Sequence, residues 1–117
     1  MVSIQTKVQD PVAIASACQR LGLAIPQHGT ARLYSGEATG LLLQLPGWLY
    51  PAVIDTQTGI VRYDTFEGRW GNPEQLHRFL QIYAVERAKL EARKKGYTVS
   101  EQALEDGSIK LQIFSGA

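Results

Sequence analysis

The sequence predicts an α+β fold: a single two-layer domain with an antiparallel-rich sheet and two helices on one face, in the order βαββββαββ. Three observations lead to this prediction. Stretches in which apolar and polar residues alternate predict strands, and two stretches with apolar residues three or four positions apart predict helices. Turn signals join most consecutive strands directly, which favours antiparallel pairing.

One domain is expected over residues 1–117, because no low-complexity stretch or linker divides the chain. The composition, 44% hydrophobic and 20% charged, is typical of globular proteins. The formal net charge of +1 creates no strong field that would attract nucleic acid or anionic lipid. No apolar run approaches the roughly 20 residues of a membrane span, and the N-terminus lacks a signal-peptide pattern. We therefore expect a cytoplasmic protein without membrane contact.

The first predicted elements are a strand and a short helix. Alternation of apolar and polar residues predicts the strand over residues 3–8. Asp10 can accept hydrogen bonds from the first turn of a helix over residues 11–21, and Pro11 suits that turn. Gly22 then permits the left-handed conformation that ends a helix.

The middle of the chain is expected to form strands and turns. Residues 36–40 are predicted to be a loop, and Pro46-Gly47 fits the centre of a type II turn. Pro51 cannot donate to a ladder, so its strand is expected at an edge or with a bulge. The strands predicted here cover residues 31–35, 41–45, 48–55 and 60–64.

The second helix has the strongest signals. Asn72-Pro73 supplies a cap and a favourable first residue, and Gly96 closes the helix. One apolar stripe runs along it: Leu76, Phe79, Leu80, Tyr83 and Leu90. A terminal hairpin should follow, with strands over residues 97–104 and 108–114 joined at Asp106-Gly107.

No group of residues predicts a catalytic or metal centre. Cys18 lies on the apolar stripe of the first helix, where a free cysteine behaves as a small buried hydrophobe. His28 and His77 are expected at the surface or at its boundary, and their spacing resembles no zinc motif. We therefore assign no catalytic residue, metal or cofactor, and an enzyme of unrecognised type is only the third hypothesis for function.

Two groups of residues are candidate binding sites. Aromatic and arginine side chains are concentrated in the central strands and the loop after them, and either stack bases or a flat ligand, or complete the core beneath the second helix. The concentration includes Phe66, and its six candidate ligand-binding residues are Trp48, Tyr50, Arg62, Tyr63, Arg69 and Trp70. Ile82 and Val85 lie opposite the Leu76 stripe, and either form a partner-binding strip or cover another element.

Three stretches carry a family resemblance: Gly68-Arg69-Trp70-Gly71, residues 78–97 (RFLQIYAVERAKLEARKKGY) and residues 105–111 (EDGSIKL). They resemble the domain of unknown function 1257 family, which includes the hypothetical chloroplast reading frame 35 proteins. Residues 30–40 and 45–48 look like the non-photosynthetic bacterial branch of that family. Plastid-type members tend to have two adjacent tryptophans where this chain has Arg69-Trp70.

The resemblance implies a small stand-alone protein, and members often occur near genes for ATPases or other small proteins. The lack of a catalytic group, the net charge near zero and the Ile82 and Val85 strip favour a non-catalytic protein-interaction module or a subunit of a cytoplasmic assembly. The partner expected on this hypothesis is a protein, an ATPase or another small protein among the candidates. The alternative is a nucleic-acid or nucleotide-binding domain that uses the aromatic and arginine residues.

Overall fold

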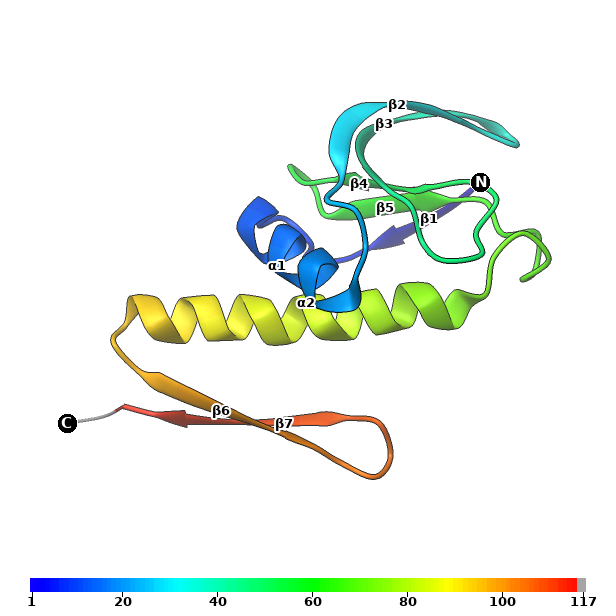
Figure 1. The fold of residues 1–117 in the computed structure, drawn as a ribbon. Coiled ribbons are helices and arrows are strands. Elements are labelled where there is room, and N and C mark those ends of the chain that lie inside the picture. The colour runs from blue at the N-terminus through cyan, green and yellow to red at the C-terminus, as the bar shows by residue number, and fades with distance from the viewer. Residues whose placement is uncertain (116–117) are drawn as a thin grey trace.

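The computed structural model describes residues 1–115 and has the predicted α+β class and element order. Helix α2 runs through the middle of the molecule, with a five-stranded sheet and helix α1 on one side and a hairpin on the other (Figure 1). The elements are β1 (Val2–Gln5), α1 (Pro11–Leu21), β2 (Gln27–Leu33), β3 (Gly36–Leu43), β4 (Ala52–Asp55), β5 (Ile60–Tyr63), α2 (Pro73–Lys94), β6 (Thr98–Ala103) and β7 (Ile109–Phe114).

The five-stranded sheet is antiparallel throughout, with the strand order β1-β5-β4-β3-β2. The last two strands do not join it, and instead form a separate two-stranded sheet against α2. The structure therefore has one more layer than the sequence predicts. In this arrangement β1 and β2 are the edge strands of the main sheet.

Both helices have the predicted caps. The Asp10 side chain accepts hydrogen bonds from the backbone N–H groups of Val12 and Ala13, at 2.9 and 3.3 Å, and α1 ends at Gly22 with φ 72°. The Asn72 side chain accepts from the N–H of Glu74 at 3.0 Å. These bonds satisfy donors that a helix leaves free in its first turn, which is why each helix begins where it does.

The prediction of a loop over residues 36–40 is wrong. Tyr34 and Ser35 form a tight turn, and the chain pairs again at once, Leu33 with Gly36 and Gly29 with Gly40. The resulting long hairpin curves over the sheet (Figure 1). A Cβ at Gly40 would lie 2.4 Å from the carbonyl oxygen of Ile54, so this glycine allows β4 to approach closely.

The expectation that the strand containing Pro51 lies at an edge is also wrong. Strand β4 begins at Ala52, one residue after Pro51, and lies between β3 and β5. Pro51 therefore precedes the ladder and removes no hydrogen bond from it. The expected turn at Pro46-Gly47 is present, with Gly47 at φ 75° and the Trp48 N–H donating to Leu45 at 3.1 Å.

Ile82 and Val85 are buried, with 0% and 6% exposure, so they do not form a partner-binding strip. Helix α2 is covered on more than one side, because α1 packs against it and the β6–β7 hairpin lies along it as well. Of the two interpretations open for these residues, the one in which they cover another element is correct.

A network of alternating charges attaches the hairpin to both helices. Glu101 of β6 accepts from Arg20 of α1 and Lys89 of α2, each at 2.8 Å. Glu86 of α2 contacts the same two cations at 3.3 and 3.2 Å. Hydrogen bonds from Arg20 and Lys89 hold the pKa of Glu101 below its ordinary value. The hairpin is thus held by ion pairs as well as by apolar contact.

Candidate functional site

The structure separates the six aromatic and arginine residues into different environments. Trp48 is 5% exposed, and its indole N–H donates to the backbone oxygen of Asn72 at 2.9 Å. Its ring packs on Tyr63, with centroids 5.7 Å apart. Arg62 lies within β5, where it is opposite Ser3 of β1 and Val53 of β4 in the sheet register. Trp48 thus belongs to the core, and the six residues do not form one binding face.

Tyr50 and Trp70 belong to a second group, which we call the Trp70 cluster: Tyr34, Tyr50, Phe66 and Trp70. Around Trp70, the centroid distances are 4.8 Å to Tyr34, 5.7 Å to Tyr50 and 4.8 Å to Phe66. Tyr34 is 68% exposed and Phe66 is 52% exposed. The Arg69 guanidinium lies over the Phe66 ring, 5.1 Å from its centroid. Tyr34 joins this cluster because the β2–β3 turn brings it there, which no local pattern indicates.

The backbone beneath the Trp70 cluster is tightly folded. Phe66 and Glu67 have positive φ values of 46° and 55°, which non-glycine residues rarely adopt. The N–H groups of Gly68 and Trp70 both donate to Thr65, at 3.1 and 2.8 Å. The Leu49 N–H donates to Trp70 at 2.7 Å. The loop therefore satisfies much of its own hydrogen bonding and packs its rings on one another.

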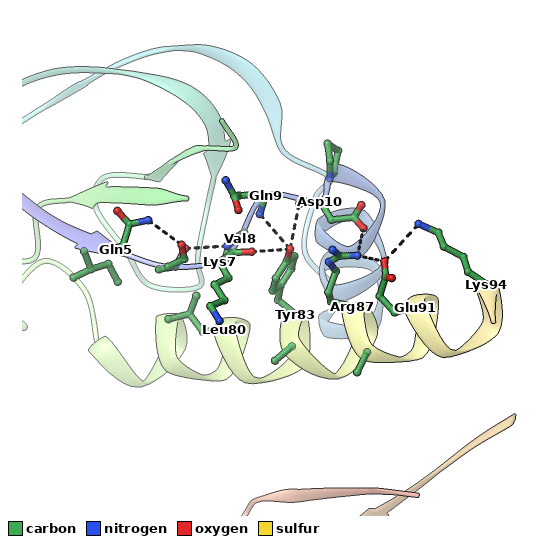
Figure 2. Close-up of a pocket in the computed structure, with 15 residues that line it drawn as sticks. Gln5, Lys7, Val8, Gln9, Asp10, Leu80, Tyr83, Arg87, Glu91 and Lys94 are labelled. Carbon is green, nitrogen blue, oxygen red and sulfur yellow. Dashed lines mark hydrogen bonds and ion pairs between the residues drawn. The ribbon is translucent and has the colours of Figure 1, made fainter. Parts of the chain in front are cut away.

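A groove of about 1120 Å³, which we call the β1–α2 groove, lies elsewhere in the molecule. One wall is the extended chain from β1 to the start of α1, and the other is α2 (Figure 2). Its apolar surface comes from both walls: Ile4, Val8, Pro11, Leu80, Ala84 and Ala88. Such concave, mainly apolar surfaces are where proteins most often bind ligands.

Tyr83 fixes the distance between the two walls. Its hydroxyl accepts from the N–H groups of Gln9 and Asp10, at 3.2 and 3.1 Å, and donates to the carbonyl of Lys7 at 3.1 Å (Figure 2). The side chain is almost fully buried. One hydroxyl thus holds three consecutive backbone units between β1 and α1 in place, and keeps the groove open beside them.

The backbone of β1 has an unpaired side. Thr6, just beyond the strand, donates its N–H to Gly59 at 2.9 Å. In an antiparallel pair alternate residues face the partner strand, so Ile4 also faces β5, whereas Ser3 and Gln5 direct their N–H and C=O groups outward. Because β1 is outermost in the sheet, no strand of the described chain takes these groups.

Most of the charged side chains in the groove form ion pairs with one another. Arg87 contacts Asp10 at 3.2 Å and is hydrogen-bonded to Glu91, and Lys94 lies 3.6 Å from Glu91. The hydrogen bond from Arg87 lowers the pKa of Glu91, and the same bond raises the pKa of Arg87. Lys7 has no ion-pair partner among residues 1–115.

Cys18, His28 and His77, whose side chains suit nucleophilic or metal chemistry, do not line this groove. Cys18 is buried, as predicted, and burial raises the pKa of its thiol to about 11, so it is protonated at neutral pH. Within residues 1–115, no group of three or more histidine, cysteine or acidic side chains is placed to hold a metal ion. In the same part of the chain, no helix has the length and apolar character needed to cross a membrane.

Comparison with known proteins identifies no match among family models, curated proteins or solved structures. The resemblance to the domain of unknown function 1257 family therefore stays a prediction. The site must be interpreted from its own geometry.

The groove has no clear signal in the sequence. Ile4 and Lys7 were consistent with an ordinary strand, and Leu80 and Tyr83 with an ordinary apolar stripe. The one local signal is Ala84 and Ala88, two small residues beside that stripe, which leave space on the helix surface. Small residues alone do not predict which element faces them.

Proposed function

We propose that this protein is an interaction module that binds an extended segment of a partner protein as an added strand on β1. The observation that carries the proposal is the outward-facing backbone of Ser3 and Gln5 at the border of the β1–α2 groove. Strand addition at an open sheet edge takes affinity from main-chain hydrogen bonds and specificity from pockets for alternate side chains.

The dimensions and chemistry of the groove support this function. The four residues of β1 span roughly 13 Å at about 3.3 Å per residue, enough to pair with a short extended segment. Alternate side chains of such a segment would face α2, where Leu80 and Ala84 offer apolar surface. An edge strand without a neighbour is also a liability for aggregation, and a bound segment would remove it.

The nucleic-acid alternative has less support. Of the six residues on which it depends, Trp48 is buried in the core and Arg62 lies within β5, opposite Ser3 of β1 and Val53 of β4. Arg69 is engaged with Phe66, and the net charge is +1. Binding of single-stranded nucleic acid uses exposed rings along a positively charged track. Tyr34 and Phe66 are exposed rings, but the Arg69 guanidinium beside them lies over the Phe66 ring.

The test is selection of random twelve-residue peptides displayed on phage against the folded protein, followed by calorimetric titration of the selected peptides. Ser3→Pro removes one outward N–H and leaves the ladder to β5 intact. We expect it to weaken binding about three- to tenfold, since one net hydrogen bond is worth about 0.5–1.5 kcal/mol.

Ser3→Ala is the matched control, because it removes the hydroxyl and keeps the N–H. We expect its affinity to stay within about twofold of the wild type. Equal binding by the Pro and Ala variants, or a selection that yields no peptide, would contradict the proposed function.

A further inference from the structure

The charges of the β1–α2 groove are unbalanced. Its lining contains three cations, Lys7, Arg87 and Lys94, and two anions, Asp10 and Glu91. Arg87 bridges both anions, and Lys94 adds a second contact to Glu91. Both carboxylates therefore have cationic partners within the protein, and the excess positive charge belongs to Lys7.

Lys7 is placed to meet a bound segment. Its backbone carbonyl is held by Tyr83, which fixes the position of the residue on the wall of the groove. The side chain extends from that wall toward α2, beside Leu80 (Figure 2). It lies in the same extended stretch as the outward-facing groups of Ser3 and Gln5, so an added strand would pass it.

We infer that the segment bound on β1 carries an aspartate or glutamate side chain that pairs with Lys7, next to an apolar side chain that contacts Leu80 and Ala84. This inference rests on the proposed function and specifies the chemistry of the partner. The positive charge at the site complements an acidic residue. Electrostatic complementarity of this kind selects among partners and fixes the register of binding.

A second copy of this chain is a poorer occupant. Pairing of β1 with β1 of another molecule would bring Val2–Gln5, which has no acidic residue, against the groove. The nearest acid along the chain is Asp10, which already caps α1 and pairs with Arg87. Self-association would leave Lys7 without a carboxylate partner, so an acidic segment of a different protein fits better.

The experiment repeats the phage selection with the same twelve-residue library on wild type, Lys7→Gln and Lys7→Glu. We expect peptides enriched in aspartate and glutamate on the wild type, no charge preference on Lys7→Gln, and enrichment of lysine and arginine on Lys7→Glu. Lys110→Glu is the matched control, since Lys110 is an exposed cation on β7, outside the groove. It should select the same acidic peptides as the wild type.

A second measurement uses one selected peptide and its variant with alanine in place of the acid. We expect the wild type to bind the alanine peptide about fivefold more weakly than the acidic peptide. Lys7→Gln should bind the two peptides equally well, because it lacks the charge that the acid pairs with. Two results overturn the inference and leave the proposed function standing. In the first, the selected peptides lose affinity for Ser3→Pro but are not enriched in acidic residues. In the second, they lose affinity for Ser3→Pro and the Lys7→Glu variant still selects acidic peptides. A selection without peptides, or with peptides indifferent to Ser3→Pro, overturns both.

Discussion

The β1–α2 groove and the Trp70 cluster both expose apolar surface, but they differ in the hydrogen bonding of the backbone beside it. In the Trp70 cluster the rings of Tyr34 and Phe66 contact Trp70 directly, and the loop backbone bonds within itself. In the groove, the outward groups of Ser3 and Gln5 have no strand of residues 1–115 beside them. The aromatic residues concentrated in the sequence thus pack largely on one another, whereas the sheet edge beside the groove leaves backbone groups outward-facing.

The largest effect on stability is expected from Trp70→Ala. It removes the ring on which three others pack, and we expect a loss of about 2–4 kcal/mol in the free energy of unfolding, somewhat less than for a fully buried tryptophan. Urea denaturation measures the loss. Affinity for selected peptides should stay within about twofold, and a large fall in affinity would show that the Trp70 cluster is part of the binding site.

Tyr83→Phe is expected to affect both stability and binding. It leaves the N–H groups of Gln9 and Asp10 without their acceptor, at a cost of about 1–3 kcal/mol. Peptide affinity should fall as well, because the wall of the groove is no longer fixed. The control is Tyr63→Phe, whose hydroxyl has no hydrogen bond to a side chain or backbone group in residues 1–115. If calorimetry gave both variants wild-type affinity, Tyr83 would have no part in shaping the groove.

A smaller effect on stability is expected at acid pH, from the ion pairs of Glu101 on the side of α2 away from the groove. The pKa of Glu101 is lowered in the folded protein, so its ion pairs stabilise the fold above the ordinary value of 4.5 and are lost as the pH falls through the folded value. We expect a loss of about 0.5–1 kcal/mol for this partly exposed network. Denaturation of Glu101→Gln should show a weaker dependence on pH below 4.5 than the wild type. Equal slopes for the two proteins would contradict the role given to Glu101.

How much the sequence predicts depends on whether the signal is local. The bounds of α1 are predicted correctly, because Asp10 and Gly22 act within one turn of the helix. Residues 36–40 are predicted wrongly, because their glycines resemble a loop while their pairing partners lie in β2. The burial of Ile82 cannot be predicted from its own helix, since it depends on how the other elements pack on α2.

The groove is not predictable from local signals for the same reason. Its two walls are residues 4–11 and α2, which are distant in the sequence and meet only when the sheet packs on the helices. The alternation that predicts β1 identifies a strand, but it does not identify that strand as an edge. Edge position depends on the complete strand order of the sheet.

The central claim is that a bound segment pairs with the outward backbone of β1, and amide hydrogen exchange measured by NMR tests it most directly. In the free protein, the Ser3 and Gln5 amides should exchange rapidly and the Ile4 amide, which faces β5, more slowly. Saturation with a selected acidic peptide should slow exchange at Ser3 and Gln5 by about tenfold or more, and change little at Trp70. Protection that appeared instead at β2, the other sheet edge, or in the loop of Phe66 and Trp70 would contradict the account.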